Sequence, residues 1–171
     1  MMDEIILGVD PGLKTAGYSV IASKNGRTGV LDIGFLSQKS SESVMARVGK
    51  FYAFMLEKTL EHNVTTIALE TPFLGKNAQT FLKLGYLRGM LYLIANQHNL
   101  RLKEFAPREV KLAVTGFGAA KKDQVSRALH SMFPALVDFK CAVRDDVTDA
   151  LGVGLCGVWK LRQDEILSRA V

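Results

Sequence analysis

The sequence predicts an α/β fold in which a mixed five-stranded sheet is covered by helices on both faces. Three strand-like segments come first, and from about residue 44 onward helical and strand patterns alternate. That order is typical of a mixed sheet with helices packed against it. The 171 residues contain no internal repeat, low-complexity stretch or linker, so we expect a single domain over residues 1–171.

The first part of the chain predicts three antiparallel strands. Ile5 to Asp10 is a short apolar run that ends at the turn Pro11-Gly12, as a buried strand would. Gly17 to Ser23 and Val30 to Ser37 flank Asn25-Gly26. Both residues of this pair tolerate a positive φ, which favours a tight hairpin.

The rest of the chain predicts alternating helices and strands. Val44, Val48, Phe51 and Met55 recur at helical spacing, and Ser41 or Ser43 could cap that helix. The elements expected after it are a buried strand from Val64 to Glu70, a long helix from about Asn77 to Gln97, an edge strand near Leu100 to Phe105, a short helix between Pro107 and Gly116, a helix from Lys121 to Phe133 and a final helix from Asp145 to Leu161.

Composition and charge favour a globular protein that binds an acidic polymer. The apolar share is 48%, and 22 Lys and Arg against 17 Asp and Glu give a net charge of +5. Residues 101–127 carry seven basic and three acidic side chains, so most of the excess lies there, around two glycines. A solvated helix surface would explain such a segment, but the clustering favours a face that binds phosphates.

Several classes of protein are excluded by what the sequence lacks. We expect a cytoplasmic location because no signal peptide or apolar run of membrane-spanning length is present. The two cysteines and three histidines show no zinc-ligand spacing, and no serine-hydrolase or phosphate-loop motif occurs.

Acidic residues at the ends of predicted strands indicate the chemistry. Asp10 closes the first strand and Glu70 closes the fourth, although each alone could be a turn or surface residue. In the last helix, Asp146 and Asp149 are three residues apart and share a face that continues into apolar helix. The helix dipole accounts for Asp145 but not for Asp149, because an acid on a buried face is costly without a partner.

Glycines in the last helix predict how these acids meet. Gly152, Gly154 and Gly157 lower helix propensity, which is understandable if the helix lies very close to the sheet. Four converging carboxylates repel one another unless cations neutralise them. Oxygen ligands without Cys or His favour Mg²⁺ or Mn²⁺, and such a set could hold two ions for phosphodiester cleavage.

The order and spacing of five motifs resemble the RuvC family of crossover junction endodeoxyribonucleases, over nearly the whole chain. The motifs are Gly8-Val9-Asp10-Pro11-Gly12, Leu69-Glu70-Thr71-Pro72-Phe73 with Lys76-Asn77, Arg108-Glu109-Val110-Lys111, Lys122-Asp123-Gln124-Val125 and Asp146-Val147-Thr148-Asp149-Ala150-Leu151. The first alone is weak because ATPases of a related fold begin in the same way, whereas the five together are specific.

The resemblance implies a ribonuclease H-like fold, a homodimer, and Mg²⁺-dependent resolution of four-way (Holliday) DNA junctions by paired nicks during recombination and repair. It does not decide whether RuvA and RuvB branch-migration proteins are partners. The resemblance implies that Asp10, Glu70, Asp146 and Asp149 are catalytic ligands of two metal ions and that Lys111 and Lys122 are catalytically important basic residues. It also implies that Phe73 is the aromatic wedge at the junction centre. The DNA-binding residues are then Phe73, Lys76, Asn77, Lys111, Lys121 and Lys122.

Two departures and three alternatives stay open. Val147 and Thr148 replace usually small residues, and Asp145 adds an acid that, together with Asp149, could replace Asp146. A buried anchor is an alternative role for Phe73. Gly85 and Gly89 predict either packing on the sheet or a two-fold dimer seam. Other functions are a ribonuclease H-like nuclease for RNA–DNA hybrids or ribosomal RNA processing, and a catalytically inert junction-binding protein.

Overall fold

A five-stranded mixed sheet forms the centre of the molecule, in the order β3-β2-β1-β4-β5. The computed structural model describes residues 4–72, 77–141 and 144–169. The strands are β1 (Glu4–Asp10), β2 (Thr15–Lys24), β3 (Arg27–Ser37), β4 (Thr66–Glu70) and β5 (Arg101–Phe105). β1, β2 and β3 are antiparallel, while β4 and β5 run parallel to β1, so the predicted mixed sheet is confirmed.

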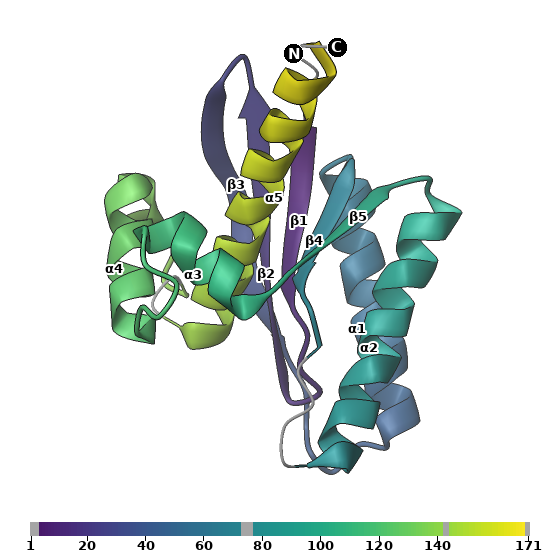
Figure 1. Cartoon of the computed structure of the whole chain (residues 1–171). Coiled ribbons are helices and arrows are strands. Elements are labelled where there is room, and N and C mark those ends of the chain that lie inside the picture. The colour runs from purple at the N-terminus through teal and green to yellow at the C-terminus, as the bar shows by residue number, and fades with distance from the viewer. Residues whose placement is uncertain (1–3, 73–76, 142–143, 170–171) are drawn as a thin grey trace.

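Helices cover both faces of this sheet (Figure 1). Helices α1 (Val44–Glu61) and α2 (Ala78–Gln97) pack on one face. Helix α5 (Asp145–Arg169) lies along the other face, with α3 (Pro107–Thr115) and α4 (Lys122–Met132) beside it. A 3₁₀ helix, η1 (Pro134–Asp138), follows α4 and was not predicted. Among the described residues, no helix is long and apolar enough to span a membrane.

Local sequence signals explain where most elements begin and end. Asn25 and Gly26 have φ values of 49° and 77°, as the predicted hairpin requires. Ser43, not Ser41, caps α1 by accepting a hydrogen bond from the Ala46 backbone N–H. The predicted end of the last helix at Leu161 is wrong, because α5 continues to Arg169. Its polar last turns lack an apolar pattern but are held by ion pairs from Asp164.

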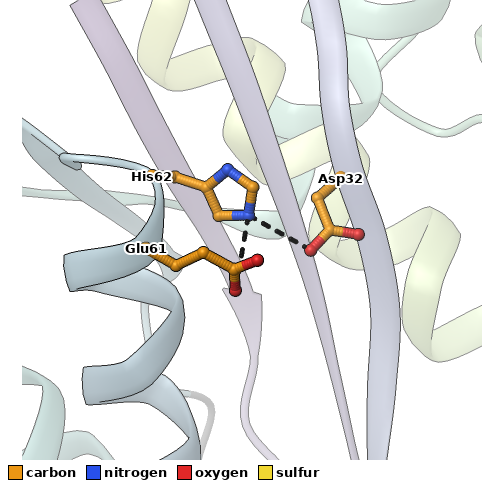
Figure 2. A group of neighbouring side chains, drawn as sticks. All are labelled: Asp32, Glu61 and His62. Carbon is orange, nitrogen blue, oxygen red and sulfur yellow. Dashed lines mark hydrogen bonds and ion pairs between the residues drawn. The ribbon is translucent and has the colours of Figure 1, made fainter.

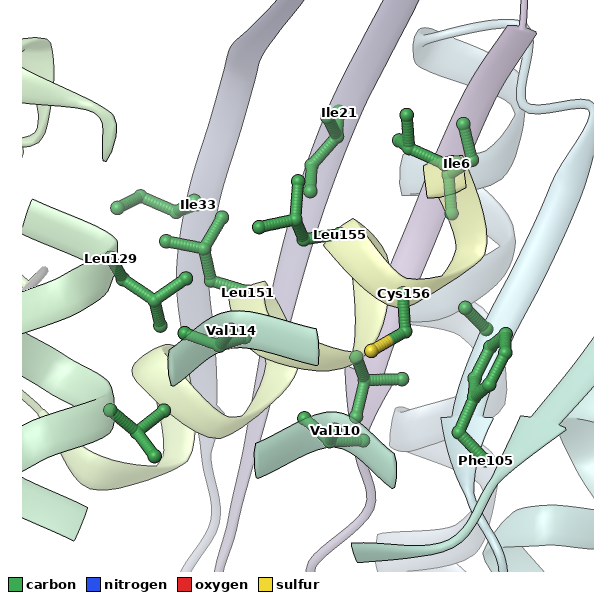
Figure 3. Close-up of a cluster of buried hydrophobic side chains, with 14 of the residues drawn as sticks. Ile6, Ile21, Ile33, Phe105, Val110, Val114, Leu129, Leu151, Leu155 and Cys156 are labelled. Carbon is green, nitrogen blue, oxygen red and sulfur yellow. The ribbon is translucent and has the colours of Figure 1, made fainter. Parts of the chain in front are cut away.

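The pleat of the strands divides the core into two clusters. Leu7 and Val9 of β1 face α1 and α2, so the intervening Gly8 and the flanking Ile6 and Asp10 face α5. Figure 3 shows the second cluster, in which Leu151, Leu155 and Cys156 of α5 meet strand residues and helix α3. This alternation determines the face on which an acid at a strand end must lie.

Close contact between α5 and the sheet confirms part of the glycine prediction. A Cβ on Gly154 would lie 3.4 Å from the Gly8 Cα, and one on Gly157 would lie 3.0 Å from Ile6 Cγ2. The prediction is wrong for Gly152, which faces Val110 of α3 at 3.2 Å. Helix α3 packs on the side of α5 that is turned away from the strands, and its close approach also requires a small residue at position 152.

Candidate active site

Three chain segments bring acidic side chains to one edge of the sheet. Asp10 ends β1 and Glu70 ends β4, and the two strands are adjacent and parallel, with Val9 opposite Leu69. Both acids follow the strand alternation onto the face that α5 covers. α5 runs in the opposite direction to β1, since Gly8 lies at Ala150 and Ile6 at Gly157. Its N-terminal turn, with Asp146 and Asp149, is therefore at the same edge.

The electrostatics of Asp10 show that the acids form one group. Burial, followed by the charges of Asp149 and Glu70, raises the pKa of Asp10 to about 7, and Asp146 adds to this while Lys122 opposes it. Burial and the Asp149 charge also raise the pKa of Glu70, against the lowering effect of Lys111 and Lys122. The carboxylates therefore repel one another in a desolvated setting, as the sequence predicted.

Basic side chains from α3 and α4 reach this group. Lys122 Nζ lies 2.8 Å from Asp149 Oδ2 and 3.7 Å from Asp145 Oδ2. The hydrogen bond to Asp149 raises the pKa of Lys122. Lys111, on α3, lowers the pKa of Glu70 through its positive charge. It also lines a cleft together with Arg108 and Phe117. The two lysines predicted to be catalytic therefore lie next to the acids.

Arg144 is a site residue that the sequence analysis missed. Its Nε lies 3.0 Å from Asp146 Oδ1 and its Nη2 lies 2.9 Å from Asp146 Oδ2, so it holds both carboxylate oxygens. The guanidinium also lies 4.0 Å from the centroid of the Phe35 ring on β3. The available signal was an arginine directly before Asp145-Asp146, but nothing in the sequence linked it to Phe35.

The position of Asp145 separates it from the other acids. Its side chain is 78% exposed, whereas that of Asp146 is 17% exposed. The charge of Asp146 also raises the pKa of Asp10. The geometry therefore favours Asp146 over the alternative in which Asp145 takes its place.

A cleft of about 490 Å³ extends from Asp10 and Glu70 beside α2. Its lining includes Gly85, Arg88 and Gly89 of α2. Arg88 donates to the backbone oxygen of Glu70 at 2.5 Å and pairs with Glu104 of β5. Arg88 thus ties the end of β4 to α2 and supports the backbone that carries Glu70.

The remaining predicted DNA-binding residues are only partly covered by the structure. Asn77 caps α2, its side-chain oxygen accepting from the Thr80 backbone N–H at 3.1 Å. Lys121 is exposed at the N-terminus of α4, next to Lys122. Phe73 and Lys76 lie outside the described residues.

A separate group of possible metal ligands lies away from this edge. Within residues 4–72, 77–141 and 144–169, Asp32, Glu61 and His62 form the one such group whose ligand atoms all lie within 4.8 Å of one another (Figure 2). Lys58 Nζ already lies 3.0 Å from Asp32 Oδ2 and 2.9 Å from Glu61 Oε2. The group is therefore an ion-pair network that ties α1 to β3, with its cation supplied by lysine.

Among the described residues, no three of the acids at this sheet edge have ligand atoms that all lie within 4.8 Å of one another. Asp149 pairs with Lys122, and Asp146 pairs with Arg144. The donor set of the four acids consists of carboxylate oxygens, which suit a hard divalent cation. Such an edge can bind cations, and its lysines can bind a phosphate beside them.

Comparison with known proteins identifies the family. A family model described as crossover junction endodeoxyribonuclease RuvC matches residues 6–157. The RuvC of Chlorobaculum parvum is 42% identical over 153 residues, which are 89% of this chain and 80% of that protein. The RuvC of Natranaerobius thermophilus is 36% identical over 152 residues, covering 89% of this chain and 92% of that protein.

Solved structures share the fold. Thermus thermophilus RuvC in complex with a Holliday junction substrate aligns with a TM-score of 0.84 at 24% identity, covering 94% of this chain and 96% of that one. The yeast mitochondrial Holliday junction resolvase Ydc2 aligns with a TM-score of 0.66 at 16% identity, over 89% and 76% of the two chains. With the family model and the sequence relatives, the conclusion is direct: the chain belongs to the RuvC family of crossover junction endodeoxyribonucleases.

Proposed function

We propose that this protein is a Holliday junction resolvase, an endonuclease that cuts four-way DNA junctions by paired, symmetric nicks. The observation that carries the proposal is the meeting of Asp10, Glu70, Asp146 and Asp149 at one edge, with Lys111 and Lys122 beside them. The family to which the chain belongs is named for this activity. The acids argue against an inert junction-binding protein, which would not need to keep repelling carboxylates together.

The same acids would hold divalent cations, with Mg²⁺ as the natural ion and Mn²⁺ as a substitute. The raised pKa values of Asp10 and Glu70 support this assignment. They show that the carboxylates repel one another without a cation, and a bound divalent cation would neutralise that repulsion. When bound, two ions would activate a water molecule and stabilise the leaving oxygen of the cleaved phosphodiester. Asp10, Glu70, Asp146 and Asp149 would be the ligands.

The basic residues would position the DNA strand. Lys111 and Lys122 stand beside the acids and would contact the phosphates around the bond to be cut. The cleft of about 550 Å³ next to them is lined by Arg108, Lys111 and the exposed Phe117. We assign this basic cleft to the DNA backbone on one side of the cut.

A homodimer would supply the second nick. Apart from their chain neighbours and the backbone of their own helix, no atom of the described residues lies within 4 Å of a Cβ placed on Gly85 or Gly89, so these glycines do not pack on the sheet. Leu82, Tyr86 and Leu93 of the same helix are exposed large apolar side chains. An α2 surface of this kind is suited to an isologous contact with a second copy. Replacing Gly89 by Leu should then yield monomers in sedimentation measurements, with Gly49→Leu on α1 as the control.

The decisive experiment is a nicking assay on a synthetic four-way junction, with linear duplex and RNA–DNA hybrid as controls. We expect paired nicks in opposing strands of the junction, a requirement for Mg²⁺ or Mn²⁺, and little cutting of either control. Preferential cutting of the hybrid would instead make the protein a ribonuclease H-like enzyme. Binding of the junction without nicks under all metal conditions would make it an inert binding protein.

A further inference from the structure

Arg144 occupies both carboxylate oxygens of Asp146, which is one of the proposed metal ligands. Both of its bonds to Asp146 are of ordinary hydrogen-bond length, and Asp146 Oδ1 also accepts from the Val147 backbone N–H at 3.0 Å. A cation coordinated by Asp146 would lie about 2.0–2.1 Å from a carboxylate oxygen if it were Mg²⁺. The guanidinium would then be a positive charge in direct contact with the same carboxylate, which disfavours binding of the ion.

Phe35 helps to hold Arg144 in this position. The aromatic ring is 4.0 Å from the guanidinium, the geometry of a favourable cation–π contact. Phe35 pairs with Gly17 of β2, and Gly17 pairs with Asp10 of β1. Arg144 therefore rests on the same edge of the sheet as the acids, two strands away from Asp10.

Arg144 has the charge and the exposure that a contact with a DNA phosphate requires. Without cations, Lys122 and Arg144 each neutralise one carboxylate. When cations occupy the carboxylates, these two side chains need new anions. The Arg144 side chain is 43% exposed, so it can reach solvent, and its planar fork matches a phosphate as well as it matches a carboxylate.

We propose that Arg144 is a positioning residue that keeps Asp146 closed to metal in the DNA-free protein and exchanges it for a DNA phosphate when the junction binds. This inference rests on the proposed function for the identity of the DNA. Metal would then load most readily after DNA is in place, and an otherwise harmful nuclease site would stay incomplete without its substrate.

The first test measures Mn²⁺ affinity without DNA by electron paramagnetic resonance. Arg144→Gln removes the charge, and Phe35→Leu keeps every charge but removes the ring that holds the guanidinium. We expect about fivefold tighter Mn²⁺ binding for Arg144→Gln and a smaller gain for Phe35→Leu. Arg127→Gln is the matched control because Arg127 also pairs with an aspartate, Asp123, but on the exposed surface of α4. It should stay within twofold of the native affinity.

This titration distinguishes two explanations for a gain in Mn²⁺ affinity: release of Asp146 from its pairing with Arg144, and the loss of one positive charge from the protein. Unchanged affinity in Arg144→Gln would overturn the proposal. A gain in Arg144→Gln without any gain in Phe35→Leu would also overturn it, because only the net charge would then matter. Circular dichroism checks the fold of each variant. If Arg144→Gln is unfolded, Arg144→Lys replaces it, because lysine cannot make the bidentate contact with Asp146. We expect Arg144→Lys to bind Mn²⁺ more tightly than the native protein, but by less than the gain expected for Arg144→Gln.

The second test measures junction binding in chelator as a function of salt. Loss of one phosphate contact should lower the slope of log affinity against log salt by about 1 in Arg144→Gln. Lys50→Gln is the control for this test, because Lys50 pairs with Glu42 outside the basic segment of residues 101–127, and its slope should not change. An unchanged slope in Arg144→Gln would show that the guanidinium does not move to a phosphate. Failure of the native protein to nick junctions would reject the proposed function, whereas the Mn²⁺ titration reports on Arg144 independently of cleavage.

Discussion

Gly17 lies directly against the first turn of α5, so that a Cβ on it would be 1.9 Å from the backbone oxygen of Asp146. Gly17 is also the residue opposite Asp10 in the β1–β2 ladder. The absence of a side chain at Gly17 therefore sets the distance between an acid on a strand and an acid on a helix. The contact is with backbone atoms, which cannot rotate away as a side chain can.

Replacing Gly17 by Ala should move the N-terminal turn of α5 and weaken the site. We expect a loss of unfolding free energy of about 1–3 kcal/mol, as for other overpacked positions, and a larger loss of cleavage than stability explains. Gly29→Ala on β3 is the control, because nothing lies within 4 Å of its Cβ position. Thermal melts and single-turnover cleavage of both variants test this, and native activity in Gly17→Ala would contradict it.

The raised pKa of Asp10 predicts how the stability of the metal-free protein depends on pH. Its folded-state pKa of about 7 is above the ordinary value of 3.8, so the folded protein binds the proton more tightly. The associated stability is full below about pH 4 and is lost as the pH rises through 7. Asp10→Asn should therefore raise the metal-free melting temperature at pH 8 by roughly 3 to 8 °C and have little effect at pH 4.

Added Mg²⁺ supplies the matching control for this pH prediction. It should raise the melting temperature of the native protein at pH 8 more than that of Asp10→Asn, because the variant lacks one proposed ligand. An Asp10→Asn variant that is less stable than the native protein at pH 8 would show that the carboxylate is favourably paired rather than repelled.

Among the acids of α5, Asp146 and Asp149 should be essential and Asp145 dispensable. Asn at either essential position should lower junction cleavage at least a hundredfold, as should Glu70→Gln, while junction binding is largely kept because the phosphate contacts remain. Asp145→Asn is the internal control, since this side chain points to solvent. Cleavage and gel-shift assays on the same preparations measure both effects; an inactive Asp145→Asn with an active Asp146→Asn would reverse the assignment.

Replacing Lys111 or Lys122 by Ala should show whether these side chains bind DNA phosphates or stabilise the transition state of cleavage. If they contact phosphates of the bound DNA, Ala at either position should lower the salt slope of junction binding by about 1. A strongly reduced turnover with an unchanged salt slope would instead place their role in stabilising charge that develops during cleavage. Lys39→Ala, in the loop before α1, is a control with the same charge change.

Phe73 should distinguish a junction enzyme from a general nuclease. Base pairs at the centre of a four-way junction are already strained, so inserting an aromatic ring costs less there than in intact duplex. Phe73→Ala should lower junction cleavage far more than stability, and Phe73→Leu should rescue only partly because Leu fills space without stacking. Single-turnover cleavage beside a thermal melt checks this; a native rate in the Ala variant would assign junction selectivity to the shape of the dimer.

Local sequence patterns are enough to specify the features of this fold that depend on local geometry. Asn25-Gly26 specifies its hairpin because both residues must adopt positive φ, and the two-residue period of β1 dictates that Asp10 faces away from the side of Leu7 and Val9. The same reasoning placed Glu70 at the parallel strand end and Asp146 with Asp149 on one helix face. Periodicity did not predict the last turns of α5, where the apolar pattern fades and Asp164 forms ion pairs with Lys103 and Lys160.

The packing of distant segments selects which charged groups neutralise one another. Lys122 and Asp149 are 27 residues apart. Arg144, which pairs with Asp146, also lies over the ring of Phe35, which belongs to a strand more than a hundred residues earlier in the chain. Likewise, Gly152 allows close packing of α3, and not of the sheet, against α5. The sequence of α5 does not show which of its sides α3 covers. Such choices depend on distances between segments that no local pattern encodes, and on the desolvation that packing imposes on each charge.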